Sequence, residues 1–190
     1  DKNLDSLEFS LTFGNGLGNG RINISPTAFL VDRCQNIYAS GWGGSLAGDG
    51  AKNLPTSMPL ANNSGLPFTS TTDNGDFYLY VSNRMADSII YASFFGGTSS
   101  NDHIDGGTSR FDKDGIIYQS VCASCGGNRS DFPTATINNS TSVHSSTNNS
   151  GNCNNALFKL DFEIVIRASF SLGNRDICLK SGTIDSVKVT

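Results

Sequence analysis

The sequence predicts an all-β protein in which a unit of about 80 residues occurs twice. Three observations lead to this prediction. Aromatic and β-branched residues are concentrated in short segments separated by turn residues, which is typical of half-buried strands. No segment shows the 3.6-residue period with end caps that marks an amphipathic helix. Finally, three blocks of sequence recur in the same order and with almost the same spacing.

The composition of the 190-residue chain excludes several classes of protein. The net charge is −4, only 16% of the residues are charged, and Ser, Thr and Asn together make up about 32%. Average chains have roughly 25% charged residues, so hydroxyls and amides cover this surface instead. Collagen and helical coiled coils need other compositions, and 13 Lys and Arg without clustering argue against a nucleic-acid partner. No apolar run approaches the roughly 18 residues of a transmembrane segment, and no signal peptide is visible.

The repeated blocks define the unit. They are 9–14 with 91–96 at an offset of 82, 32–38 with 112–118 at an offset of 80, and 77–81 with 156–160 at an offset of 79. Three blocks that keep their order are difficult to explain by chance. The chain therefore contains two copies of one supersecondary unit.

Each unit is predicted to contain four strands. They are expected at 9–14, 28–31, 37–40 and 77–81, and again at 91–97, 109–111, 116–120 and 156–162. The second and third strands are joined by a tight turn, 32–36 or 112–115, whose Asp, Asn and Gly residues suit Asx-turn or left-handed geometry. A long polar insert, 45–75 or 126–152, precedes the fourth strand, and the simplest interpretation is a surface loop anchored by a Phe.

Four strands in a repeated unit are typical of a β-propeller blade. A single blade must stack on neighbours, and two blades cannot close a ring, so we expect the chain to be part of a longer protein. The alternating segment 163–172 and the segments 176–179 and 186–190 suit strands that open a β-sandwich. The predicted organisation is a first blade at 1–85, a second at 86–163, and the truncated start of an immunoglobulin-like module at 164–190.

The cysteines favour disulfide bonds over a metal site. There are five, Cys34, Cys122, Cys125, Cys153 and Cys178. A zinc ribbon needs two C-x-x-C pairs and only one is present, whereas a surface poor in Lys and rich in hydroxyls favours an oxidising compartment. We expect Cys153 to pair with Cys122 or Cys125, closing a loop of roughly 30 residues. The odd count indicates a partner outside the sequence, which we assign to Cys178.

Other candidate groups have simpler interpretations. Asp102, Asp105, Asp112 and Asp114 could hold calcium, but 112–115 lacks the acidic residue that completes an EF-hand loop, so Asx turns are favoured and no metal or other cofactor is predicted. The two histidines, His103 and His144, lie in no catalytic motif. The Gly-rich segment 14–20 is not followed by a helix that could bind phosphate. Trp42 is interpreted as buried between blades, with a platform for sugar stacking as the alternative.

The second unit resembles a known family in its order of motifs. These are Tyr91-Ala92-Ser93-Phe94-Phe95-Gly96-Gly97, Asp102-His103-Ile104-Asp105-Gly106-Gly107, Asp112-Lys113-Asp114-Gly115, Ile117-Tyr118-Gln119-Ser120-Val121-Cys122, Asp131-Phe132-Pro133-Thr134 and Asn154-Asn155-Ala156-Leu157-Phe158-Lys159. This set resembles the β-propeller repeat region of large gliding-motility-associated surface proteins of Bacteroidota. The segment from Ala168 onward looks like the start of the PKD-type module that often follows it.

The resemblance implies export by a type IX secretion system, a cell-surface or extracellular site, and an adhesive or filament role without catalytic residues. It also implies O-glycosylation of Ser or Thr in an Asp-Ser/Thr-hydrophobic context, for which Ser6, Ser88 and Ser186 are candidates. The expected partners are the rest of a longer chain and other surface subunits or surface glycans.

Two alternatives to a non-catalytic structural or adhesive segment stay open. One is an accessory propeller of a secreted carbohydrate-active enzyme, which would need two acidic side chains about 5–9 Å apart across a cleft. The other is a docking segment whose Ser/Thr-rich loops become ordered against a partner chain.

Overall fold

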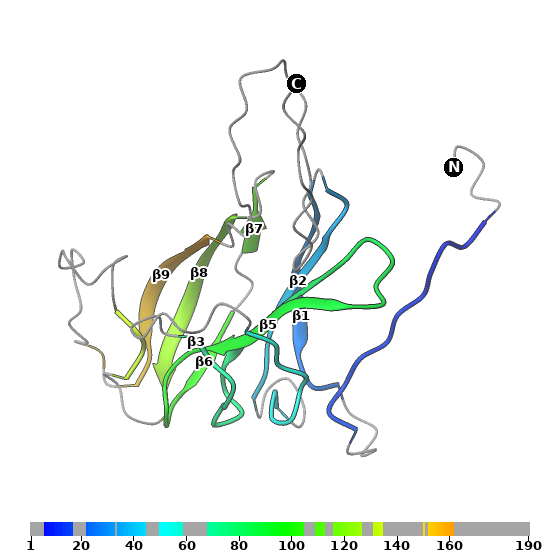
Figure 1. The fold of residues 1–190 in the computed structure, drawn as a ribbon. Helices are drawn as coiled ribbons and strands as arrows, with labels where there is room; N and C mark the ends of the chain where they lie inside the picture. The colour runs from blue at the N-terminus through cyan, green and yellow to red at the C-terminus, as the bar shows by residue number, and fades with distance from the viewer. Residues whose placement is uncertain are drawn as a thin grey trace, which may run out of the picture.

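We describe a computed structural model of the chain. The described residues are 6–16, 22–32, 34–44, 50–58, 68–104, 109–112, 116–126, 131–134, 150 and 152–161. Within them there is no helix, and the strands form two antiparallel sheets (Figure 1). The all-β prediction is therefore confirmed. Among these same residues no helical segment has the length and apolar character needed to cross a bilayer.

The first sheet is an antiparallel meander. Its main strands are β1 (Ser25–Val31), β2 (Ile37–Trp42), β4 (Phe77–Ser82) and β5 (Ile89–Phe95), and each pairs with the next. A two-residue strand, β3 (Phe68–Thr69), pairs with the outer edge of β5. Short turns join β1 to β2 and β4 to β5, whereas the long segment 43–76, which contains β3, joins β2 to β4.

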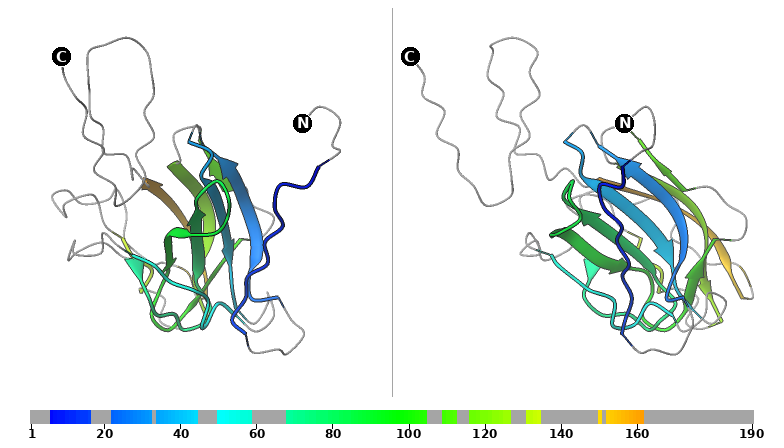
Figure 2. Two further views of the ribbon diagram at one scale, coloured as in Figure 1. Left: turned by 45° about the vertical axis from the view of Figure 1, so that its right-hand side comes forward. Right: turned by 90° about the vertical axis from the view of Figure 1, so that its right-hand side faces the viewer.

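The second sheet is centred on the longest strand, β8 (Ile116–Cys125). One edge of β8 pairs with β9 (Asn154–Asp161), and the other edge pairs with β6 (Asn101–His103) and β7 (Ser109–Phe111) in turn. Thus β6 and β7 occupy the place that the single strand β1 occupies beside β2. The views in Figure 2 show the two sheets lying against each other.

The turn between the second and third predicted strands has the same hydrogen bonds in both units. In the first, the Asp32 backbone N–H donates to Asn36 O (3.1 Å) and the Asn36 N–H donates to Asp32 Oδ1 (2.8 Å). In the second, Asp112 N–H donates to Ile116 O (2.8 Å) and Ile116 N–H donates to Asp112 Oδ1 (3.0 Å). The sequence predicted tight turns with Asx-turn or left-handed geometry here. The tight turns are present and alike, but each carboxylate accepts the N–H four residues on rather than the N–H two residues on that defines an Asx turn.

These turns correct the alignment of the third block. With the turns aligned at an offset of 80, Tyr38 corresponds to Tyr118. Tyr38 pairs with Val81 in the first sheet and Tyr118 pairs with Lys159 in the second, so the fourth strands correspond at an offset of 78 residues. The offset of 79 inferred from the sequence is therefore wrong by one residue. Because side chains alternate between faces, a one-residue slip assigns every side chain of the strand to the other face.

The main core lies between the two sheets. From the first sheet it takes alternate residues of β4, together with Tyr38, Tyr91 and Phe95, and from the second it takes residues of β8 and β9. Its buried members are Tyr38, Phe77, Leu79, Val81, Tyr91, Phe95, Ile104, Ile117, Val121, Ala123 and Leu160. At its centre the Phe158 ring of β9 lies 5.2 Å from the Phe77 ring and 4.8 Å from the Phe95 ring, measured between centroids. Side chains of both units thus form one core.

The opposite face of the first sheet carries a second core. Tyr78 and Tyr80 of β4 and Phe94 of β5 pack there under Ile24 and Leu54. Every residue of β4 is buried, because both of its faces are covered. The Phe-Tyr-Leu-Tyr-Val sequence of this strand is apolar or aromatic throughout for the same reason.

Three differences from the predicted strands stand out. Residues 9–14 form no strand, and 91–95, which the repeat assigns to the second unit, complete the first sheet as β5. Strands β3 and β6 lie in segments where no strand was predicted. The segment 164–190 lies outside the described residues.

Candidate functional site

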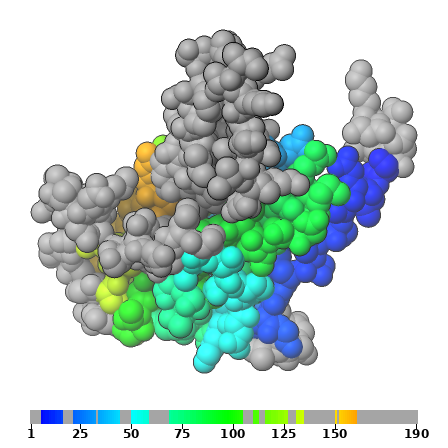
Figure 3. Space-filling view, viewed as in Figure 1, coloured from blue at the N-terminus to red at the C-terminus, as the bar shows by residue number. Residues whose placement is uncertain are grey.

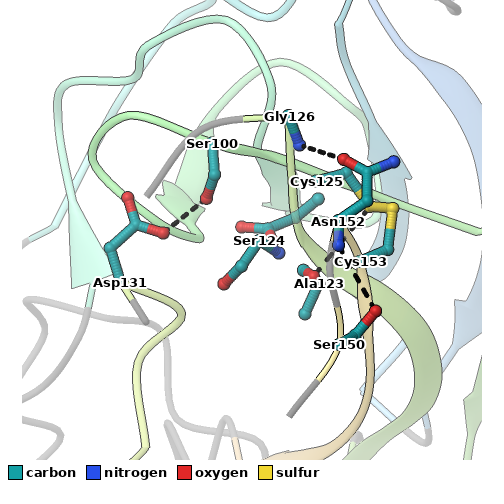
Figure 4. Close-up of a disulfide and its surroundings, with 10 residues drawn as sticks. Ser100, Ala123, Ser124, Cys125, Gly126, Asp131, Ser150, Asn152 and Cys153 are labelled. Carbon is teal, nitrogen blue, oxygen red and sulfur yellow. Dashed lines mark hydrogen bonds between the residues drawn. A yellow bond between two sulfur atoms is a disulfide. The ribbon is translucent and has the colours of Figure 1, made fainter. Parts of the chain in front are cut away.

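The disulfide joins Cys125 at the end of β8 to Cys153 just before β9 (Figure 4), with the two Cα atoms 4.4 Å apart. It is one of the two pairings left open by the sequence. Cys122 lies opposite Asn155 within the β8–β9 ladder, whereas Cys125 lies just past its last pair, Ala123 with Asn154, beside the residue that precedes β9. Cys125 is therefore the cysteine within reach of Cys153. Cys34 is also disulfide-bonded, and Cys178 lies outside the described residues.

Removing this disulfide is expected to lower the free energy of unfolding by about 3–4 kcal/mol, because it closes a loop with a sequence separation of 28. The comparison is between the double variant Cys125→Ala/Cys153→Ala and the wild type in chemical denaturation. Cys122→Ala is the matched control, since it removes the other cysteine of the same motif, and its effect should be below about 1 kcal/mol. An equal loss in the control would contradict the assigned pairing.

Four aspartates gather beside the disulfide, where both sheets end, and we call them the carboxylate cluster. They are Asp73 and Asp76 before β4, Asp102 in β6, and Asp131 in the segment that follows β8. Their charges interact: Asp102 and Asp73 both raise the pKa of Asp76, and Asp131 raises the pKa of Asp102. The cluster therefore joins segments that are far apart in the sequence.

Asp102 ties the end of β5 to β8. Its side chain is fully buried. Oδ2 accepts the Gly97 N–H (2.8 Å) and Oδ1 accepts the Ser124 N–H (2.7 Å), so each carboxylate oxygen has a backbone donor. Burial is the largest effect on its pKa and raises it to about 7, although these two hydrogen bonds lower it.

Asp76 faces Asp102 across Gly96. It is 1% exposed; the Thr72 hydroxyl donates to its Oδ2, while Oδ1 has no hydrogen-bond partner in the described part of the chain. A Cβ atom on Gly96 would lie within 3 Å of oxygens of both carboxylates, so only glycine fits at this position. Burial raises the pKa of Asp76 to about 7, with the neighbouring charges of Asp73 and Asp102 adding to the effect.

Asp131 holds the loop that follows β5. Its Oδ2 accepts the backbone N–H groups of Thr98 and Ser99, both at 2.8 Å, and the Ser100 hydroxyl donates to its Oδ1 (Figure 4). Burial alone would raise its pKa, but these hydrogen bonds outweigh burial and lower it. The next residue, Phe132, packs against Phe95 with ring centroids 5.6 Å apart. The Asp131-Phe132 pair thus anchors the insert, as the sequence predicted for the Phe.

An open hollow lies next to the cluster. Trp42, half-buried at the end of β2, has its ring 5.6 Å from that of His103, which is 7% exposed on β6. Asn101, Asp102 and Asn152 line the same hollow, and Asn152 Oδ1 accepts the Gly126 N–H (3.1 Å). Trp42 is thus neither fully buried between sheets nor a free surface platform.

The carboxylates of the cluster act as hydrogen-bond acceptors that hold backbone segments together. Asp102 and Asp131 accept backbone N–H groups of loops that would otherwise lack partners. Among the residues that the structure describes, no three His, Cys, Asp or Glu side chains are grouped to hold a metal ion. The Asp112 carboxylate accepts the Ile116 N–H in the turn before β8, and Asp105, Asp114 and His144 lie outside the described residues.

The glycosylation candidates lie away from the cluster. Ser6 and Ser88 are exposed, Ser88 at the turn between β4 and β5, where the Asn83 N–H donates to its carbonyl (3.1 Å). Ser186 lies outside the described residues.

Sequence reasoning singled out Asp102 but missed Asp73 and Asp76. Asp76 has one sequence signal, the Asp-Phe dipeptide: Asp76-Phe77 and Asp131-Phe132 both place a carboxylate directly before a Phe that packs in or against the core.

The fold and site define an all-β protein of stacked antiparallel sheets, held at one end by a disulfide and buried carboxylates. No protein-family model matches this chain, and searches of the curated proteins and of the solved structures found no match.

Proposed function

We propose that this chain is a non-catalytic structural unit of a large secreted cell-surface protein, with an adhesive or filament role that could serve gliding motility. The observation that carries the proposal is the repeated unit itself. The same Asp-closed turn, in which the carboxylate accepts the N–H four residues on, recurs in both units, and the two sheets bury a common aromatic core. Units that stack on copies of themselves build extended structures, since each contacts only its neighbours.

The sheets suit consecutive β-propeller blades. The meander β1-β2-β4-β5 has the strand order of a blade, and β6 and β7 with β8 and β9 supply the corresponding part of the next. In a propeller the first strands of neighbouring blades lie next to each other. Here β1 contacts β7, and Gln119 Nε2 of β8 donates to Thr27 Oγ1 of β1 (3.4 Å). The immunoglobulin-like module at 164–190 is supported by sequence alone.

A secreted location suits the disulfide, because such bonds persist in oxidising compartments. Export by type IX secretion and the modification of Ser6, Ser88 and Ser186 rest on the family resemblance.

A second candidate function is glycan binding at the hollow beside Trp42, as in an accessory domain of a carbohydrate-active enzyme. The specific observation is an aromatic ring beside amide side chains: Asn101 and Asn152 line the hollow together with Trp42. Aromatic faces and a few polar groups are the usual components of ligand sites.

One titration tests both candidates. Trp42 is the only Trp, so its fluorescence reports directly on the hollow when neutral oligosaccharides and bacterial polysaccharides are added. If the chain is non-catalytic, the wild type should release no more reducing ends from these glycans than the double variant Asp76→Asn/Asp102→Asn does. If the hollow binds a glycan, the Trp42 emission should change on addition of that glycan, and Asn101→Ala should weaken the change. Release of sugar that depends on the two aspartates would overturn the non-catalytic role. Unchanged emission would remove the glycan site.

A further inference from the structure

Residues 7–13 form an exposed, extended segment with an alternating apolar pattern. Leu7 is 81% exposed, and Phe9, Leu11 and Phe13 are each about 40% exposed. Figures 1 and 3 show this dark-blue segment along one side of the molecule. Within the described part of the chain its backbone takes part in no strand pairing. A strand with apolar residues at every second position and unpaired backbone groups is a template for pairing with another strand.

The internal repeat shows what such a segment pairs with. Residues 9–13 match 91–95, the strand β5, which pairs antiparallel with β4. The burial differs sharply between the two copies: Tyr91 is 9% and Phe95 2% exposed, against about 40% for Phe9 and Phe13. The segment therefore has the sequence of a sheet strand but is paired with no strand among the described residues.

One contact already places the segment. The Phe13 ring stacks on Tyr80 of β4 with centroids 4.9 Å apart and an interplanar angle of 7°. This contact fixes the end of the segment on the outer face of the first sheet, while Leu7, Phe9 and Leu11 lie exposed beyond it.

The matching acceptor is β9. It corresponds to β4 in the second unit, and among the described residues only one of its edges is paired, with β8. Leu157 of β9 is 81% exposed, whereas Leu79, its counterpart in β4, is 1% exposed. Figures 1 and 2 place β9 and the dark-blue segment on opposite sides of the molecule, so the segment does not reach β9 of its own chain.

We infer that residues 7–13 of one copy of this chain add as a strand to the edge of β9 in a second copy, the edge that has no partner among the described residues. The register follows from the pairing of β4 with β5: Leu11 lies opposite Leu157, and Phe9 lies opposite Lys159. Donor and acceptor are different surfaces, so the contact is heterologous and links copies head to tail into rows. This inference rests on the proposed structural role and identifies a second copy of the chain as the binding partner.

Sedimentation velocity of the full chain over a range of concentrations tests the contact. The wild type should associate as the concentration rises, and Leu11→Lys should weaken association by about tenfold or more, because a charge replaces an apolar side chain buried by pairing. The matched control is Met85→Lys, which adds the same charge to a side chain 48% exposed in the β4–β5 turn, and it should leave association unchanged. Circular dichroism confirms that both variants fold.

Cysteine cross-linking tests the register. A chain with Leu11→Cys and a chain with Leu157→Cys, mixed under mild oxidation, should form a disulfide-linked dimer, because directly opposite Cβ atoms lie about 4.5–5.5 Å apart. Met85→Cys with Leu157→Cys is the control and should give little dimer. A monomeric wild type, or equal cross-linking in the control, would overturn the inference. Neither result bears on catalysis, so failure here is distinguishable from failure of the non-catalytic role, which the sugar-release assay decides.

Discussion

Raising the pH from about 5 to about 8 is expected to lower the free energy of unfolding by several kcal/mol, on the order of 4 kcal/mol. Asp76 and Asp102 are the cause, because burial raises the pKa of each from 3.8 to about 7. The measurement is urea denaturation across this range of pH.

The direction follows from proton uptake. Between pH 4 and pH 7, roughly, the folded state holds protons on these two carboxyls that the unfolded state has lost, so stability falls as the pH rises. The other two aspartates of the cluster do not reverse this trend. The pKa of Asp73 is also raised, mainly by burial, so Asp73 acts in the same direction. The pKa of Asp131 is lowered, so Asp131 does not titrate between pH 5 and pH 8. A stability that rises from pH 5 to pH 8 would contradict the assignment.

Two single variants separate the roles of the pair. Asp76→Asn should raise the free energy of unfolding near pH 8 by about 1–2 kcal/mol and flatten the pH dependence, since it removes a charge with an unpartnered oxygen. Asp102→Asn should also flatten the pH dependence but should raise stability near pH 8 by less, because an amide can accept only one of the Gly97 and Ser124 N–H groups. Destabilisation by Asp76→Asn would show that Asp76 has a stabilising partner.

The second large effect is expected in the core shared by the sheets. Phe77→Ala should lower the free energy of unfolding by about 3–5 kcal/mol, because Phe77 is fully buried and its ring contacts Phe158 of the other sheet. Phe29→Ala is the matched control: Phe29 is 70% exposed on β1, and its loss should change stability by about 0.5 kcal/mol or less. Thermal and chemical denaturation of both variants provide the comparison.

Strands with local signals could be predicted from the sequence. Three features depend on neighbours within a few residues: the continuous apolar and aromatic run of β4, the aliphatic run that begins β8, and the Asp-closed turns at Asp32 and Asp112. Local patterns of this kind are what sequence periodicity and turn chemistry report.

Features that depend on distant partners could not be predicted. The choice of Cys125 over Cys122 follows from the ladder register of β8 with β9, which no local sequence pattern specifies. Asp76 and Asp102 meet only because Gly96 lies between them. Residues 9–14 have a strand sequence, but without a pairing partner in the described residues the pattern alone does not make a strand.

Hydrogen exchange of the backbone amides, read by mass spectrometry in the wild type and in Phe77→Ala, tests the central claim that the two repeated units form one stacked structure. If the sheets share their core, the substitution in β4 should reduce protection in β8 and β9 as well as in β2 and β5, because the units open together. Loss of protection confined to the first sheet, with β8 and β9 unchanged, would contradict the stacked arrangement.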